Sequence, residues 1–223
     1  GKYDKALEAL DDVRMGYYNA GIPIPDRVEN CREEVQFQLD LHTRMEEGLE
    51  LIDSGDWERA RNVFRDAVKQ FNDFQGFKDQ LAELEEAIKK EKEVIRSISG
   101  LRSNFDSVSQ IKSLSAELDS LQTMLRSEQP TTRQQQARQT LERMESELLR
   151  RALNEAQSKA DLANIAAEPI EKRGYYDDAL STLDLIEEIA GSDERVVELR
   201  SSINRKREEF NAEQQFEENR QIK

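Results

Sequence analysis

The chain has 223 residues, 36% hydrophobic and 36% charged, and its formal net charge is −14 at pH 7 with a pI near 4.7. This acidity argues against nucleic acid or an anionic membrane as the main partner. With nine Gly, four Pro, one Cys and no long apolar run, the composition favours an almost all-helical chain without an internal disulfide or a membrane-spanning segment.

The first predicted helix covers residues 3–15 and ends near the Gly-Tyr-Tyr sequence at 16–18. Its apolar positions recur at helical spacing, so we expect one inward face made of Ala6, Leu7, Leu10 and Val13. The Ile-Pro-Ile-Pro sequence at 22–25 predicts an extended connector, because each proline disfavours helix in the residue before it.

A long helix is predicted over residues 26–52. Asp26 with Glu29 three positions later follows the capping-box pattern at its start. Apolar or small residues recur every three or four positions, as in packed helix pairs. The expected inward seam is Val28, Cys31, Val35, Gln38, His42, Met45, Leu49 and Ile52.

The next predicted helix starts at Trp57, with Asp56 as its N-cap. Small and large side chains alternate along one of its faces, which predicts close approach of a neighbouring helix at each alanine and filling of the gaps by the aromatic rings. The residues of this face are Trp57, Ala60, Phe64, Ala67 and Phe71.

Three further segments follow. After a predicted turn at 72–76, a long helix carries apolar residues from Phe77 to Ile98 and is interrupted at Ser99-Gly100. A shorter element runs from Phe105 to Leu125 and ends before Pro130. Thr131 or Thr132 is expected to cap the next long helix, with a break before the alanine-rich part and a kink or fresh start at Pro169. Its inward residues are expected to be Ala137, Leu141, Met144, Leu148, Ala152, Ala156, Ala160, Ala163 and Ala166.

The last predicted hairpin begins at Gly174. Its short helix is expected to bury Ala179, Leu180, Leu183 and Ile186 and to end at Gly191 in a left-handed conformation. Ser192 then caps a final helix with inward residues Val196, Leu199, Ile203 and Phe210. Apolar content falls sharply after Phe210, so we predict a polar helical tail over residues 211–223.

An internal repeat connects four of these segments. Each has an aromatic residue, an acidic residue, a free position and a small apolar residue, as in Gly55-Asp56-Trp57-Glu58-Arg59-Ala60. The other copies lie at residues 1–7, 103–109 and 174–180, of which the one at 103–109 lacks the glycine. Self-similarity of this kind is typical of repeat proteins.

The chain resembles the tetratricopeptide repeat family on these residues. The second helix of such a repeat has Gly, an aromatic, Ala, a large apolar residue and Ala at fixed offsets, and Gly55, Trp57, Ala60, Phe64 and Ala67 match them. Looser matches are Gly1, Tyr3, Ala6, Leu10 and Val13 at the start, and Gly174, Tyr176, Ala179, Leu183 and Ile186 near the end. Ala163, Ala166, Ala167 and Ile170 fit the first helix of that last repeat. The resemblance implies an all-α, elongated α-solenoid of about four helical hairpins over residues 1–210.

The departures from the family pattern lie in the long helices. The aromatics Tyr3, Trp57, Phe105 and Tyr176 are spaced beyond the usual 34 residues. Arg44 and Glu47 stand where the family has large apolar residues, unless the register slips by one to Met45 and Leu49.

Other positions bear on the ligand and on the extent of the chain. Where carboxylate-clamp grooves of the family use Lys and Asn, this chain has Met45, Leu49 and Asp53, so an acidic tail is not the expected ligand. Because the chain opens on the second half of a hairpin, we expect it to be a piece of a longer protein.

The sequence predicts no catalytic, cofactor-binding or metal-binding residues. His42, the single histidine, and Cys31, the single cysteine, lie on the predicted seam and are interpreted as packing residues. The acidic pairs at 33–34, 46–47, 85–86 and 187–188 point about 100° apart on a helix, which favours solvated faces over acid–base pairs. Arginines between 126 and 151 alternate with glutamates, which favours a salt-bridged face over an acidic-peptide site.

Aromatic residues near helix ends leave two interpretations open. Tyr17, Tyr18, Phe74 and Phe77 fit either a partner hot spot or packing between hairpins.

These features predict a non-catalytic protein–protein interaction or scaffold module of a larger protein, which binds a partner helix or peptide on its repeat surface. Two alternatives stay open: coiled-coil-like self-assembly or a spacer role, and a regulatory arm of a catalytic or nucleotide-binding domain elsewhere. We expect a protein or peptide partner, no nucleic acid, no membrane, no cofactor and a cytoplasmic location.

Overall fold

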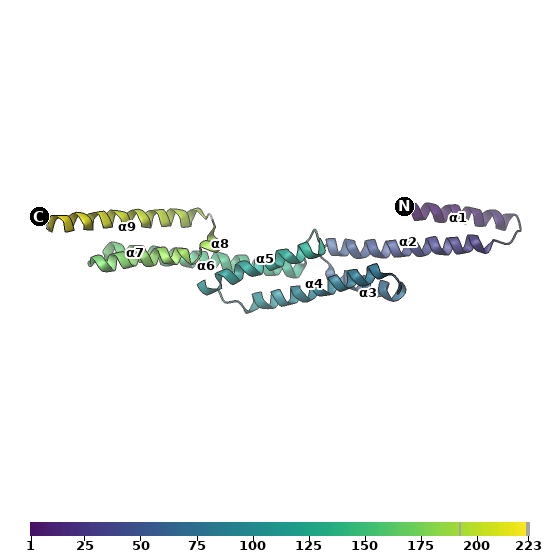
Figure 1. Cartoon of the computed structure of the whole chain (residues 1–223), viewed down its shortest axis with the longest axis horizontal. Helices are drawn as coiled ribbons and strands as arrows, with labels where there is room; N and C mark the ends of the chain where they lie inside the picture. Colours follow the sequence, from purple (N-terminus) through teal and green to yellow (C-terminus); the bar gives the residue numbers. More distant parts are fainter. Residues whose placement is uncertain (192, 222–223) are drawn as a thin grey trace. The chain divides into compact units, whose positions relative to one another are not determined.

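The structure is a computed structural model that describes residues 1–191 and 193–221. Its elements are α1 (Lys2–Asn19), α2 (Asp26–Asp53), α3 (Trp57–Gln70), α4 (Gln75–Gly100), the 3₁₀ turn η1 (Phe105–Ser107), α5 (Val108–Leu125), α6 (Thr132–Ile165), α7 (Pro169–Asp184), α8 (Glu187–Ala190) and α9 (Glu194–Gln221) (Figure 1). The described part of the chain contains no strand, so the all-α prediction is confirmed. None of the described helices is both long enough and apolar enough to cross a membrane.

The chain divides into two compact units. Unit 1 comprises Gly1–Lys92 and Ser120–Thr132, and unit 2 comprises Glu93–Asp119 and the chain from Arg133 onward. Helices α4 and α5 therefore each contribute residues to both units.

In unit 1, α1 packs antiparallel to α2 through charged side chains. Arg14 Nε lies 3.0 Å from Glu29 Oε1, and Arg32 Nε lies 2.7 Å from Asp11 Oδ1. The later residue of α1 thus pairs with the earlier residue of α2, as antiparallel helices require. No residue of α1 is buried. Of its predicted inward residues, Ala6, Leu7 and Leu10 are half-buried, but Val13 is 45% exposed and that assignment was wrong.

Helix α2 does not have the single inward seam that its periodicity predicts. Ile52 is buried, whereas Cys31, His42 and Leu49 are exposed. The reason is that α2 has two partners on different faces: Arg32 faces α1, while Gly48 faces α3. The remaining predicted seam residues, Val28, Val35, Gln38 and Met45, are half-buried.

Helix α2 begins at Asp26 as predicted, but the capping box predicted there was wrong. Its N-cap is Pro25, no side chain makes a capping hydrogen bond, and Asp26 is the first helical residue. The Pro25 carbonyl accepts the Val28 N–H at 2.8 Å instead.

Helix α3 is as the sequence predicts. It begins at Trp57, and the Asp56 side chain accepts a hydrogen bond from the Arg59 N–H. Its whole predicted face is buried: Trp57, Ala60, Phe64, Ala67 and Phe71. Phe77 at the start of α4 is fully buried, and its ring lies 6.2 Å from that of Phe64 and 5.6 Å from that of Phe71.

The connector between α5 and α6 docks on the α2–α3 corner within unit 1. The Ser127 hydroxyl lies 2.7 Å from the Ile52 carbonyl, and the Gln129 N–H donates to the Asp53 carbonyl at 2.9 Å. Gly55 has φ +78°, and a Cβ there would lie 2.7 Å from the Pro130 carbonyl oxygen. Gly55 therefore allows both the left-handed turn and the close approach of this connector.

In unit 2, α6 is one unbroken helix, so the break predicted before its alanine-rich part does not occur. The predicted fresh start at Pro169 is confirmed, with proline in the first turn of α7. Gly174 lies inside α7 and does not begin a helix, which corrects the predicted start of the last hairpin. Proline sets the helix start five residues earlier because its missing N–H costs nothing in the first turn.

The residues assigned to the helix before Gly174 do not form a separate helix. Ala163 belongs to α6, Ala166 and Ala167 follow its end, and Ile170 lies in the first turn of α7 with 87% of its surface exposed. Helix α7 also ends at Asp184, earlier than predicted, and Gly191 instead ends the one-turn helix α8 with φ +52°. The Ser192 cap falls outside the described residues.

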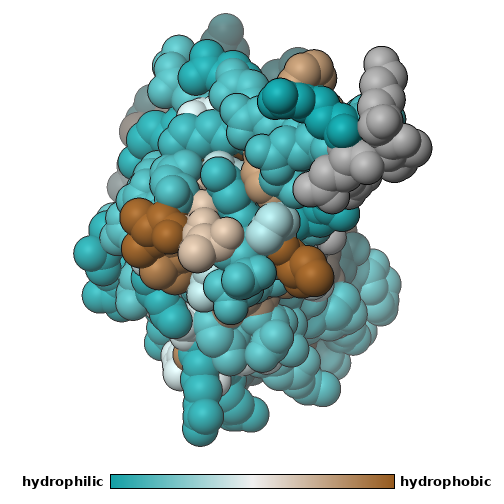
Figure 2. Space-filling view, turned by 90° about the vertical axis from the view of Figure 1, so that its left-hand side faces the viewer, coloured by the Kyte–Doolittle hydropathy of each residue, from teal (hydrophilic) through white to brown (hydrophobic). Residues whose placement is uncertain are grey.

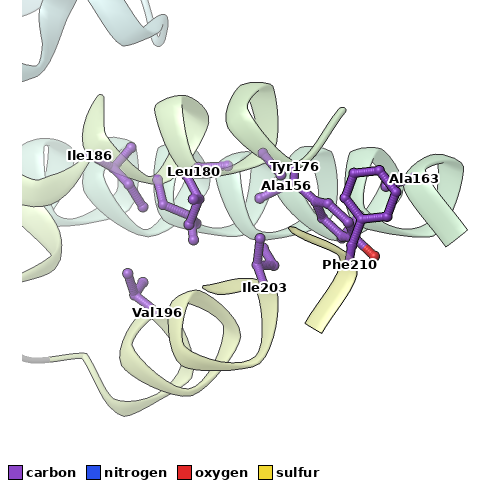
Figure 3. Packing of buried hydrophobic residues seen from close by; sticks show 12 residues of the cluster. Ala156, Ala163, Tyr176, Leu180, Ile186, Val196, Ile203 and Phe210 are labelled. Carbon is purple, nitrogen blue, oxygen red and sulfur yellow. The ribbon is translucent and has the colours of Figure 1, made fainter. Parts of the chain in front are cut away.

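One buried apolar cluster of unit 2 lies between α6, α7 and α9 (Figure 3). Alanines of α6 leave room for Tyr176 of α7, while Val196, Ile203 and Phe210 of α9 point toward α7. Helices α7 and α9 run antiparallel, as ion pairs Arg200–Asp184 at 2.6 Å and Arg207–Asp177 at 3.0 Å show. The four residues predicted to be inward in and just after α7 are all buried: Ala179, Leu180, Leu183 and Ile186. Those predicted for α9 are buried too, except Leu199, which is half-buried.

Candidate functional site

A surface groove of unit 2 lies between the end of α4 and α5, with a volume of about 430 Å³. Its residues on α4 are Arg96, Ser97 and Gly100, Leu101 follows directly, and α5 contributes Gln110, Ser113, Leu114 and Glu117. The groove exists because three of these positions, Ser97, Gly100 and Ser113, carry small or no side chains. A Cβ added at Gly100 would have no neighbour within 4 Å.

The floor of the groove is apolar. Leu114 is 8% exposed and Leu101 is half-buried. The serine hydroxyls beside them are engaged by their own helices, because Ser97 donates to the Glu93 carbonyl at 3.1 Å and Ser113 lies 3.4 Å from a carboxylate oxygen of Glu117. An apolar side chain can therefore enter without leaving a serine hydroxyl unpaired.

The rim of the groove carries both charge signs. Arg96 on α4 forms no ion pair with any side chain that the structure describes, and Glu117 stands on the α5 side. An apolar floor with a few placed polar groups is the usual composition of a binding site.

A second groove, of about 270 Å³, lies between α2 and α3 in unit 1. Its charged groups already pair within their own helices: Arg44 with Glu47 at 2.8 Å, and Lys69 with Asp66 at 2.8 Å. The Lys69 hydrogen bond, together with nearby arginines, lowers the pKa of Asp66. Because its charges are satisfied and its apolar lining is limited to the half-buried Leu51 and Val63, this groove is the weaker candidate.

Exposed apolar side chains also occur where α6 ends and α7 begins. Leu162, Ile165 and Ile170 are 40%, 78% and 87% exposed. On the face that Figure 2 shows, apolar atoms form small brown groups separated by paler and hydrophilic atoms. Such separate side chains are normal on protein surfaces and do not form a continuous docking patch.

The residues that the sequence singled out for chemistry are not brought together. His42 is exposed, with Nε2 3.1 Å from Glu46, so it is not a core residue. Its ring lies 6.0 Å from that of Tyr3 of α1, which fits the other predicted place, a helix interface. Cys31 is exposed, not buried. Among the described residues, no three His, Cys, Asp or Glu side chains are grouped so that they could hold a metal ion.

Neighbouring glutamates diverge as predicted. Glu85 pairs with Arg65 of α3, whereas Glu86 pairs with Lys90 of its own helix. In the arginine-rich segment, Arg138 pairs with Asp119 at 2.6 Å, and Arg151 donates to the Ser103 carbonyl at 2.7 Å and covers the Phe105 ring. These two arginines of α6 thus bind α5 and the segment just before it.

The aromatic residues near helix ends differ in their surroundings. Phe77 is core, Phe74 packs against it with ring centroids 5.1 Å apart, Tyr17 is half-buried and Tyr18 is 74% exposed. Packing therefore accounts for Phe74 and Phe77.

The α4–α5 groove was missed by the sequence reading. Ser99-Gly100 predicts the end of α4 at this point, but the run of small residues Ser97, Ser99 and Gly100 was also a signal of a shallow surface. Comparison of the chain with protein-family models, with curated proteins and with solved structures finds no match in any of the three.

Proposed function

We propose that this chain is a non-catalytic protein–protein interaction module built from tetratricopeptide-like helical hairpins, and that it binds a partner helix in the α4–α5 groove. In this proposal about four hairpins stack as an elongated α-solenoid, and a cytoplasmic location is part of the same proposal. The partner is a protein, since the acidic surface repels nucleic acid and anionic lipid.

The α2–α3 hairpin supports the repeat assignment. The family pattern places a glycine in the first helix and an Ala-x-x-x-Phe sequence in the second. Gly48 takes the glycine position, and Ala60 and Phe64 take the others. A Cβ at Gly48 would overlap the Phe64 ring, so this hairpin requires a glycine where the family pattern has one.

The groove itself is the observation that carries the binding role. It runs along α5 from Gln110 to Glu117, which corresponds to about 10 Å, or two helical turns. Helix-in-groove recognition uses apolar anchors spaced three or four residues apart on the partner, and two turns accommodate one such pair.

Gly100 allows a direct test. Gly100→Phe places a large side chain over the groove, and because a Cβ there has open space the fold should be unchanged. Gly174→Phe is the matched control: it is also a helical glycine of unit 2 with no neighbour within 4 Å of an added Cβ, but it lies outside the groove. Both variants should show wild-type circular dichroism.

The measurement is quantitative capture of proteins from native lysate on immobilised wild type and both variants. We expect at least one protein that the wild type and Gly174→Phe retain equally and that Gly100→Phe loses by tenfold or more. Equal retention of every captured protein by all three would remove the groove from the proposal.

A further inference from the structure

The last turns of α9 leave one large apolar side chain in solvent. Phe216 is 65% exposed, and the described residues after Phe210 include no buried one. The Arg220 guanidinium lies 5.8 Å from the centre of its ring. Ala212 stands one turn earlier on the same face of α9, so the two residues form the i, i+4 spacing of a helical anchor pair.

We propose that the α4–α5 groove receives this end of α9 from a second copy of the chain. The inference rests on the proposed function, because it names the occupant of the same groove. Both parts have the required chemistry: an apolar floor of Leu101 and Leu114 on one side, and Phe216 with Ala212 on the other.

The charges are complementary as well. The rim of the groove has Arg96 on α4 and Glu117 on α5. At the end of α9, Glu213 precedes Phe216 by three residues and Glu217 directly follows it. Arg220 lies one turn beyond Phe216. One orientation of the helix in the groove places glutamate near Arg96 and Arg220 near Glu117, so the pairing selects a direction.

Docking within one chain is excluded by the geometry of unit 2. Arg151 of α6 lies beside Ser103, next to the groove, whereas Asn164 of α6 lies beside Tyr176. Those positions on α6 are about 20 Å apart at 1.5 Å per residue. Phe210 is beside Lys172, near the Asn164 end, and α9 continues from there as a helix away from the groove.

The expected association is weak. Two turns of helix in a groove cover far less than the roughly 1,200 Å² that a stable interface buries, and both copies carry a net charge of −14. At about 0.15 M salt this repulsion is largely screened beyond roughly 8 Å, so the measurement belongs at that salt concentration or above.

The test is sedimentation equilibrium of the purified protein from about 10 μM to about 1 mM, a range that brackets a weak contact. The average mass of the wild type should rise above 25.8 kDa with concentration. Phe216→Ala and Gly100→Phe should each weaken association by tenfold or more. Ile170→Ala, another exposed apolar position, and Gly174→Phe should behave as wild type.

Mixing the two deficient variants gives the sharpest outcome. Phe216→Ala retains an intact groove and Gly100→Phe retains an intact tail, so the mixture should associate although neither variant does alone. A wild type that stays monomeric to about 1 mM, or association that ignores both substitutions, overturns the inference. If the lysate capture is nevertheless lost with Gly100→Phe, the proposed function stands and only the second copy is wrong as the occupant.

Discussion

Gly55 carries two independent constraints at the corner between α2 and α3. Its φ of +78° is left-handed, and its Cα faces the Pro130 carbonyl so closely that a Cβ would lie 2.7 Å from the oxygen. The neighbouring atoms are backbone, held by the hydrogen bonds from Ser127 and Gln129 to this corner, and they cannot turn aside as a side chain would.

Gly55→Ala should therefore destabilise the protein by about 1–2 kcal/mol for the left-handed conformation and by about 1–3 kcal/mol more for the overlap. Urea unfolding followed by circular dichroism measures this. Gly174→Ala is the control, and it should stabilise by up to about 1 kcal/mol because it is a helical glycine in open space. Equal stability of the two variants would contradict the docking of the connector.

Gly48 and Phe64 act as a pair between α2 and α3. Phe64 is fully buried, so its ring cannot move away from a methyl group at position 48. Gly48→Ala should cost about 1–3 kcal/mol by overpacking, although alanine is the better helix former.

A double-mutant cycle with Phe64→Leu measures this coupling. The alanine should be tolerated better beside the smaller leucine, giving an interaction energy of about 0.5–3 kcal/mol. Additive losses would show that the two residues do not share this space.

At the scale of elements, α2 and α3 show what a periodic pattern can predict. In α3 one face carries Trp57, Phe64 and the alanines between them, and every predicted residue of that face is buried because a single stripe meets the neighbouring helices. In α2 different faces meet different partners: His42 lies beside Tyr3 of α1, whereas Phe37 packs against Phe71 at the end of α3. The pattern of one helix does not tell which positions face which partner, so Cys31, which is exposed, was wrongly placed inward.

Other errors have the same origin in context. Gly174 matches the glycine of the repeat, but Pro169 had already begun the helix in which it lies. The α4–α5 groove depends on which small residues of two helices face each other, and that pairing is set by tertiary packing. The sequence therefore predicted the helices and much of the core, and it did not predict the candidate site.

Helix α1 is linked to α2 by ion pairs around Asp11. It has no buried residue, and Asp11 accepts hydrogen bonds from both Arg32 and Arg14. The hydrogen bond from Arg32, followed by its charge and that of Arg14, lowers the pKa of Asp11 despite some desolvation. Folding thus favours the ionised form of this carboxylate.

The sign of the pH dependence follows. A carboxylate whose pKa is lowered in the folded state contributes stability above its unfolded pKa of about 3.9 and loses it as the pH falls through the folded value. Acidification from pH 5 toward pH 2 should therefore loosen α1 from α2, seen as lower protection factors of the α1 amides, that is, intrinsic amide exchange rates divided by the observed rates at the same pH.

Asp11→Asn should give faster exchange in α1 already at pH 7 and a smaller further change on acidification. Asp12→Asn, on the exposed side of the same turn, is the control and should resemble the wild type. If both variants exchange alike at pH 7, the Asp11 contacts do not hold this helix.

At the scale of the whole molecule, the division into two units predicts uneven stability. Phe64 is in the core of unit 1, and Ile203 is in the core of unit 2, where it is 1% exposed. In a protein assembled from neighbouring hairpins, each segment is stabilised mainly by its own contacts and those of the next hairpin. Local openings should therefore have different free energies in the two units.

Phe64→Ala should cost about 3–5 kcal/mol and Ile203→Ala about 2–5 kcal/mol, each mainly where the side chain packs. Hydrogen exchange with peptide-level mass spectrometry separates these effects. Phe64→Ala should accelerate exchange in α2, α3 and the start of α4 while α7 and α9 change little, and Ile203→Ala should do the reverse. Because each variant is the control for the other, uniform acceleration along the chain in both would mean one cooperative unit, and the hairpin-by-hairpin account of stability would be wrong.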